Sequence, residues 1–146
     1  MLKGISPLLS PALLKALCEM GHGDELVIAD GNFPAESVGK DAIVVRADGH
    51  GGAAILEAIL PLLPLDSYTE QPVALMQVVP GDDCPTPAIW SEYSALLEKY
   101  EPEHSEIDYM ERFAFYERAK KAYLIIATGE TAIYANILLK KGVVKA

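Results

Sequence analysis

The chain has 146 residues, 51% of them hydrophobic, and a formal net charge of -9 from 21 acidic and 12 basic side chains. This length predicts one domain, residues 1–146, with enough apolar content for a core that needs neither disulfides nor metal ions. The acidic balance repels phosphate backbones and anionic lipid headgroups, so neither nucleic acid nor a membrane is an expected partner.

Helical and strand patterns alternate along the chain. In chain order, the predicted elements are a helix from Pro11 to Gly21, strands Glu25–Asp30 and Ala42–Asp48, a helix Ala53–Leu60, a strand Pro72–Val79, a helix beginning at Pro87, a helix Tyr109–Ala119, and strands Ala122–Gly129 and Tyr134–Leu139. The strands are nearly continuous apolar runs, typical of a sheet covered on both faces. This alternation predicts an α/β domain with helices on both faces of the sheet.

Polar residues mark where the predicted helices begin. Ser10 is the expected N-cap of the first helix, with Pro11 at its first position. Thr86 precedes Pro87 in the same way, and Asp108 with Glu111 forms a start similar to a capping box. These signals predict where three of the helices begin.

Nothing in the sequence predicts export or membrane insertion. The N-terminal segment lacks the apolar stretch of a signal peptide, and no run reaches the ~18 apolar residues of a membrane span. The two cysteines, Cys18 and Cys84, have no CxxC spacing, and Cys18 is expected to be a small buried residue of the first helix. We therefore expect a cytoplasmic protein.

Two of the three histidines lie between glycines. His22 precedes the first strand and His50 follows the second, whereas His104 lies in a charged loop and is expected to be solvated. A side chain flanked by glycines has no bulky neighbours along the chain, so a ligand can approach it closely. His22 also follows the end of the first helix, and completing that helix cap is the alternative role.

Two aspartates end apolar strands and precede glycine. In α/β sheets ligands bind beyond the carboxyl ends of the strands, which places Asp30 and Asp48 where they could bind a polar ligand. The alternative is that each residue caps a turn or a helix. Capping suits Asp48 better because a predicted helix follows it, while both alternatives stay open for Asp30.

The late segment from Glu111 to Val143 is rich in aromatic and charged residues. Phe113 and Tyr116 are expected in the core, and Arg112 taken alone is expected on the surface. Tyr134 and Asn136 are two apart in a predicted strand and so face the same side. A phenol beside an amide suits the hydroxyl groups of a sugar.

Other chemistries lack their motifs. The sequence has neither GxGxxG nor GxxxxGK[ST], and "DGHGG" at Asp48–Gly52 is only faintly similar to a phosphate-binding loop. Metal-ligand spacings such as HExxH and the GxSxG elbow of serine hydrolases are also missing. We therefore expect no bound cofactor, no metal and no nucleophilic catalysis.

Several blocks together resemble one known family. The segments are "MLKGISPLLSPALLKALCEMGHGDELVIADGNFP", "RADG", "LDSY", "RFAFYERA" and "YANILLKKGV". In this order they are similar to the family of L-fucose mutarotases and D-ribose pyranases, and most similar to its fucose branch. The resemblance runs nearly end to end and is weakest between about Val79 and Ile107.

The resemblance implies an α/β/α fold, with a mixed, largely parallel sheet, and an enzyme that interconverts sugar anomers without metal or cofactor. It implies that His22 is the catalytic proton donor and that Asp30 and Arg112 bind substrate. Tyr134, Ala135 and Asn136 would close the site from a neighbouring subunit of a ring-shaped homo-oligomer, a pentamer or decamer, with Tyr134 sharing in proton transfer. Asn32 stands where the fucose branch often has histidine, which bears on the preferred sugar.

Three alternatives to an L-fucose mutarotase follow from the same residues. The first is a D-ribose pyranase, since the family includes both activities. Related pyranoses such as D-galactose could also react. The second is a sugar-binding module that uses the same residues without catalysis. The third, a hydrolase built on Asp30, is disfavoured by the missing metal-ligand spacing.

Overall fold

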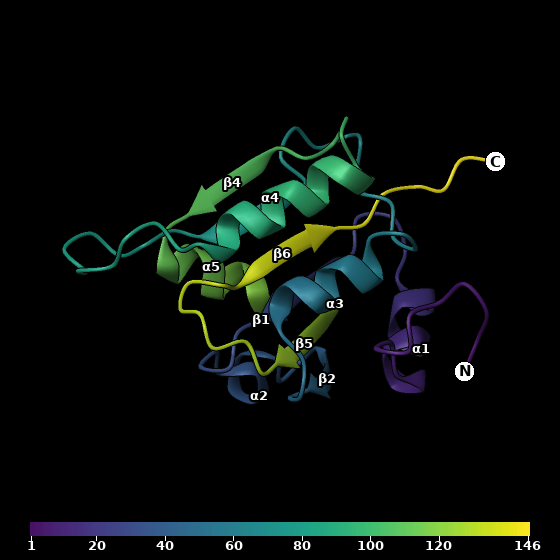
Figure 1. Ribbon diagram of the computed structural model, residues 1–146, viewed down its shortest axis with the longest axis horizontal. Coiled ribbons are helices and arrows are strands. Elements are labelled where there is room, and N and C mark those ends of the chain that lie inside the picture. Colours follow the sequence, from purple (N-terminus) through teal and green to yellow (C-terminus); the bar gives the residue numbers. More distant parts are fainter.

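A six-stranded sheet forms the centre of the computed structural model, which describes residues 1–146 (Figure 1). The strands are β1 (Glu25–Ala29), β2 (Ile43–Ala47), β3 (Val73–Met76), β4 (Ile107–Met110), β5 (Leu124–Thr128) and β6 (Ile137–Lys140). Their order in the sheet is β2-β5-β1-β6-β3-β4. Neighbouring strands pair in parallel except where β6 runs antiparallel between β1 and β3. The predicted mixed, largely parallel sheet is confirmed.

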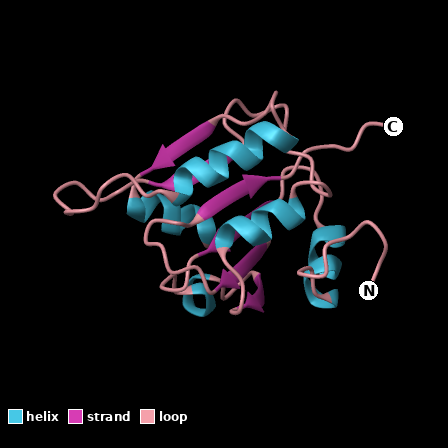
Figure 2. Ribbon diagram, in the orientation of Figure 1, coloured by secondary structure: helices cyan, strands magenta, loops and turns pink.

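Helices cover both faces of this sheet (Figure 2). They are α1 (Pro11–Glu19), α2 (Ala35–Val38), α3 (Gly52–Ile59), α4 (Ile89–Tyr100) and α5 (Arg112–Ala119). One apolar core holds buried residues of α1, α3 and α4, and a second holds those of α2 and α5. Because side chains alternate along a strand, β1 sends Leu26 and Ile28 into the first core and Val27 and Ala29 into the second. This confirms the predicted α/β/α layers.

The largest error of the sequence prediction lies before α5. The helix expected to start at Tyr109 starts at Arg112, and the residues before it form the edge strand β4. Glu111 is itself the N-cap, because its carboxylate accepts hydrogen bonds from the N–H groups of Phe113 (2.9 Å) and Ala114 (3.0 Å). Asp108 therefore lies in a strand and takes no part in the cap.

Three other boundaries move. The strand predicted to run to Val79 ends at Met76, and Thr86 does not cap α4, which begins at Ile89 without a side-chain cap. Residues 77–88 form instead a long loop that reaches far from the sheet (Figure 2). The last strand begins at Ile137, three residues later than predicted. By contrast, Ser10 caps α1 as predicted, its Oγ accepting the N–H of Leu13 at 3.2 Å.

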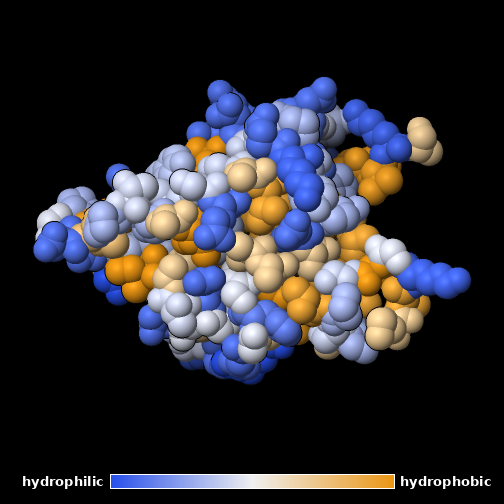
Figure 3. All heavy atoms as spheres, viewed as in Figure 1, coloured by the Kyte–Doolittle hydropathy of each residue, from blue (hydrophilic) through white to orange (hydrophobic).

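Some residues expected in the core, or apolar in character, lie on the surface. Cys18 is exposed, so the prediction that it is buried in the first core is wrong. Apolar side chains are also exposed at both chain ends, which lie on the same side of the molecule (Figures 1 and 3). None of the helices is long and apolar enough to cross a membrane.

Candidate functional site

A cavity of about 310 Å³ opens beyond the carboxyl ends of the parallel strands. Its lining residues come from the segment after β1, the end of β3, the loop 77–88, the helix α5 and the segment before β6. They are Asp30, Asn32, Phe33, Met76, Asp82, Arg112, Tyr116, Ile133, Tyr134 and Asn136. This end of an α/β sheet is the usual place for a ligand, and the volume is at the small end for small-molecule sites. It fits a molecule the size of a monosaccharide.

Asp30 is the buried carboxylate of this cavity. It follows β1 directly, only 6% exposed, and its own N–H donates to Asn136 Oδ1 at 2.7 Å. Its carboxylate accepts the N–H groups of Asn32 (3.0 Å) and Ala135 (3.4 Å). Burial raises the pKa of Asp30 above its ordinary value, and these hydrogen bonds offset the rise only in part. A carboxylate in this state can exchange a proton more readily than an exposed one.

The segment Tyr134–Asn136 is held in an uncommon backbone conformation. Tyr134 has φ 56°, in the left-handed region that few residues other than glycine adopt. Two aromatic residues of α4 fix this bend from behind, since Trp90 Nε1 donates to Tyr134 O and the Tyr93 hydroxyl donates to Ala135 O, both at 2.8 Å. The bend turns both Tyr134 and Asn136 into the cavity although neither lies in the strand that was predicted for them.

The polar groups of this segment differ in what they can offer a ligand. The Tyr134 hydroxyl donates to the carboxylate of Asp82, and this hydrogen bond raises the pKa of Tyr134. The proton of the phenol is thus engaged by Asp82, and the phenol oxygen can still accept a hydrogen bond from a ligand. Asn136 uses its Oδ1 on Asp30, which leaves its amide N–H groups free to donate.

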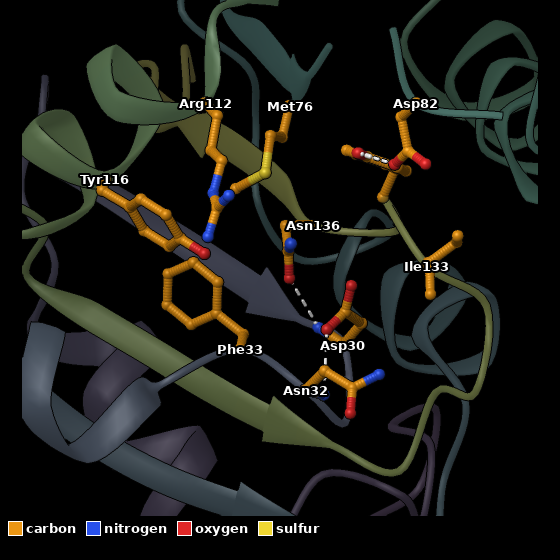
Figure 4. A pocket seen from close by; sticks show the side chains of 10 residues that line it. Asp30, Asn32, Phe33, Met76, Asp82, Arg112, Tyr116, Ile133 and Asn136 are labelled. Atoms are coloured by element: carbon orange, nitrogen blue, oxygen red, sulfur yellow. Dashed lines mark hydrogen bonds between the residues drawn. The ribbon is translucent and has the colours of Figure 1, made fainter. Parts of the chain in front are cut away.

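Arg112 brings positive charge to the opposite wall of the cavity (Figure 4). It is the first residue of α5, directly after the N-cap Glu111, and forms no ion pair with a carboxylate of the chain. Its guanidinium lies 5.7 Å from the ring centre of Tyr116, a cation–π contact that holds it near the cavity. An unpaired guanidinium facing a buried carboxylate suits a neutral ligand with many hydroxyl groups.

Three aromatic and aliphatic side chains of the lining were missed by the sequence analysis. Phe33 and Tyr116 pack 5.5 Å apart and form an apolar wall together with Met76. The expectation that Phe113 lies in the core is wrong, because Phe113 is 67% exposed. Tyr116 is partly buried and packs against the second core while it also lines the cavity. Helical spacing alone cannot separate a core position from one that faces a cavity.

His22 lies apart from this cavity, at the other end of β1. Its Nε2 is 3.0 Å from Asp66 Oδ1, and its ring is 5.4 Å from that of Tyr68. The five residues of β1, which span roughly 17 Å, lie between it and Asp30. One chain thus brings together Asp30, Arg112, Tyr134, Ala135 and Asn136 but does not bring His22 to them.

This arrangement differs from the expectation that a neighbouring subunit supplies the wall Tyr134–Asn136. Both Ala135 and Asn136 hydrogen-bond Asp30 of the same chain, so this wall and Asp30 belong to one pocket. The residue that is separated from the pocket is His22.

The remaining candidates take structural roles or none. Asp48 pairs with Arg46 at 2.6 Å and does not cap α3, whose Gly52 N–H donates instead to Glu130 Oε2 at 3.0 Å. His50 lies outside the cavity, whereas Asn32 lines it. No group of three His, Cys, Asp or Glu side chains is placed to hold a metal ion.

Asp66 makes a testable contribution to stability in acid. Burial opposes its ionisation, but hydrogen bonds from Thr69, His22 and the Tyr68 N–H prevail and lower its pKa from 3.8 to about 2. The folded state therefore gains about 2.5 kcal/mol above the unfolded pKa, and loses it as pH falls through about 2. Between about pH 5 and about pH 2, the free energy of unfolding measured in urea should fall by about 2 kcal/mol more in the wild type than in Asp66→Asn. Equal losses in the two proteins would contradict the assignment.

The chain is similar to proteins of known identity over nearly its whole length. A family model described as "RbsD / FucU transport protein family" matches residues 3–144. The L-fucose mutarotase of Actinobacillus pleuropneumoniae is 52% identical over 98% of this chain and 97% of its own. The structure of the fucose mutarotase of Streptococcus pneumoniae in complex with L-fucose superposes with a TM-score of 0.92, at 50% identity, and covers 99% of this chain and 100% of its own. Bacillus subtilis RbsD complexed with D-ribose is more distant, with a TM-score of 0.72 and 26% identity over 99% of this chain and 100% of its own.

Proposed function

The chain belongs to the RbsD/FucU transport protein family, and from this membership we infer that it is an enzyme that interconverts the anomers of L-fucose. The observation that carries the inference is the cavity itself. In a space of about 310 Å³, a buried carboxylate, Asp30, faces the unpaired guanidinium of Arg112. The enzyme is an isomerase of monosaccharide anomers.

The reaction requires two proton transfers and no redox change. The anomeric hydroxyl O1 loses its proton while the ring oxygen O5 gains one, the C1–O5 bond breaks and C1=O1 forms. After rotation about C1–C2, the O5 hydroxyl adds to the other face of the aldehyde and both protons return. One group that accepts a proton and one that donates it are sufficient, and such positioned transfer is typically worth ~10²–10⁴-fold in rate.

The residues of the cavity suit the roles of binding and of accepting the proton. Asp30, with its raised pKa, takes the O1 proton and returns it on ring closure. Arg112 and the free amide of Asn136 orient the sugar hydroxyls, and Tyr134, whose own proton is donated to Asp82, accepts a hydrogen bond beside them. The backbone N–H of Ala135 holds the Asp30 carboxylate in place.

His22 is the proton donor in this proposal, and it comes from a second copy of the chain. Since β1, which spans roughly 17 Å, lies between His22 and Asp30, no single chain can present both to one sugar. A closed ring of identical copies, a pentamer or a decamer built from two pentamers, would place the His22 of one copy over the cavity of the next. Each site would then be shared between two subunits.

The lining favours L-fucose over D-ribose, the alternative substrate. L-Fucose carries a methyl group on C5, whereas C5 of the pyranose form of D-ribose is a CH₂ group with no carbon substituent. Phe33, Met76 and Tyr116 offer that methyl group an apolar wall, and burying one methyl group is worth about 0.8 kcal/mol. The chain is also less similar to the ribose-bound RbsD than to the fucose-bound mutarotase, which agrees with L-fucose as the preferred sugar.

Anomer exchange is measured directly by NMR saturation transfer between the two anomeric protons. We expect catalytic amounts of the protein to raise the exchange rate of L-fucose strongly, that of D-galactose less and that of D-ribose least. A heat-denatured sample is the control. Line broadening of fucose without faster exchange would instead indicate a non-catalytic sugar-binding protein, and fastest exchange of D-ribose would assign the pyranase activity.

A further inference from the structure

Asp82 is an exposed carboxylate at the edge of the cavity, in the loop between β3 and α4 (Figure 4). Its side chain forms no ion pair within the chain. The hydroxyl of Tyr134 is its single hydrogen-bond partner. The contacts of Asp82 therefore connect it to the cavity wall and not to the core of the fold.

A tight turn, residues 79–82, brings Asp82 to this position. The N–H of Asp82 donates to Val79 O at 3.0 Å, and Gly81 between them has φ 89°. Pro80 followed by Gly81 is the typical sequence of a type II turn, because proline restricts its own φ and glycine adopts the positive one. The turn 79–82 thus sets the backbone position of Asp82 without the help of a ligand.

The same turn contacts the hydroxyl of Tyr134 with two groups. The Asp82 carboxylate accepts the phenol proton, and the Val79 N–H donates to the phenol oxygen at 3.4 Å. A phenol oxygen donates one hydrogen bond and accepts others, so it can still accept one from a ligand. Tyr134 is fixed at both ends, since Trp90 of α4 holds its backbone carbonyl.

The direction of the hydrogen bond to Asp82 matters for a sugar in the cavity. Arg112 and the amide N–H groups of Asn136 are donors, and the Asp30 carboxylate is an acceptor. Without Asp82 the phenol of Tyr134 could turn its proton toward the sugar, and Asp30 would then be the only acceptor among these four groups. With its proton held, Tyr134 is a second acceptor. Because each sugar hydroxyl both donates and accepts, two donors and two acceptors suit a ring with several hydroxyl groups.

We propose that Asp82 is a positioning residue that holds the proton of Tyr134, so that the phenol oxygen accepts a hydrogen bond from one hydroxyl group of the sugar. The proposal rests on the proposed binding of a monosaccharide in this cavity. Asp82 acts through Tyr134 and takes no proton from the sugar. The hydrogen bond is present before and during ring opening alike, so it contributes to binding and not to the chemical step.

Titration of Tyr134 tests the pairing without any sugar. The hydrogen bond to Asp82 raises the pKa of Tyr134 above its ordinary value. In protein labelled with ¹³C at Cζ of tyrosine, Tyr134→Phe identifies the signal of Tyr134. Asp82→Ala removes the acceptor and its negative charge, so Tyr134 should titrate at lower pH in this variant than in the wild type. Asp83→Ala is the matched control, since it removes the next carboxylate of the same loop, which does not contact Tyr134, and should keep the wild-type titration.

Kinetics of L-fucose exchange test what the pairing does for the sugar. Asp82→Ala should raise KM by about 5–10-fold, the equivalent of one hydrogen bond, and leave kcat nearly unchanged. In Tyr134→Phe, which has no phenol oxygen, adding Asp82→Ala should raise KM no further. Asp83→Ala should keep the wild-type KM and kcat.

Three results would overturn the proposal. If Asp82→Ala raises KM as much in Tyr134→Phe as in the wild type, Asp82 contacts the sugar itself. If it changes neither the titration of Tyr134 nor KM, the hydrogen bond does not position the phenol. A loss confined to kcat would assign Asp82 to the proton transfer. If the wild type neither binds L-fucose nor accelerates its exchange, the proposed function fails, while the titration still shows whether Asp82 holds the proton of Tyr134.

Discussion

Replacing His22 by alanine should lower the rate of L-fucose anomer exchange by about 10²–10⁴-fold, the usual contribution of one positioned acid–base group. The expected loss is in kcat, because the imidazole meets the substrate chiefly at O5 as the C1–O5 bond breaks. The fold should tolerate the change, since the side chain is nearly half exposed and hydrogen-bonds only Asp66. NMR saturation transfer at saturating L-fucose measures the effect.

His104→Ala is the matched control for this experiment. It removes the same chemical group from the loop between α4 and β4, where His104 does not line the cavity and forms no hydrogen bond or ion pair with His22 or Asp66, and it should leave the rate unchanged. The circular dichroism and thermal unfolding of His22→Ala should match those of the wild type. If the variant then exchanges the anomers at the wild-type rate, His22 is excluded as the proton donor.

The second large effect is a restoration of activity. Arg112→Ala removes the only guanidinium that lines the cavity, and by itself should be nearly as inactive as His22→Ala. When the two inactive proteins are unfolded together and refolded as a mixture, one chain supplies an intact His22 and the other an intact cavity. With random assembly of equal amounts, about a quarter of the shared sites should be intact, and activity should return to that level.

A double variant shows whether this restoration has the proposed cause. The chain that carries both His22→Ala and Arg112→Ala has neither half of the site, so mixing it with His22→Ala cannot create an intact one. If native mass spectrometry detects mixed oligomers of the two single variants but the mixture stays inactive, the site is not shared between copies. Full activity of a single separated chain would contradict the idea equally.

The sequence is most informative about elements buried on both faces. The strands β1 and β5 are continuous apolar runs and were predicted within a residue or two, because each side of the sheet is covered by helices. The edge strand β4 was missed since it is short and partly exposed, so its residues carry no long apolar run. The four-residue helix α2 is too short to show a helical period.

The residues of the candidate site also differ in whether the sequence alone could identify them. Asp30 could be found because a polar residue that ends a buried strand has few structural explanations. Asp66 could not, although it lies in the quoted "LDSY" segment, because the pairing with His22 joins residues 44 apart and appears only in three dimensions. Phe33 and Tyr116 were missed for a related reason, since a pattern of apolar residues does not say which of them faces a cavity.

The strand β6 has a consequence for the geometry of the proposed ring. It follows Asn136 of the cavity directly and ends at Lys140, beside Asp66, so this strand of about 13 Å spans most of the distance between the cavity of a chain and its own histidine. In a ring of shared sites, the length of β6 would largely set the distance between one active site and the next. Hydrogen bonds to β1 on one side and to β3 on the other keep that length constant. Inserting a single residue would lengthen this distance and reverse which face each following side chain occupies, so that neighbouring active sites would lose alignment together.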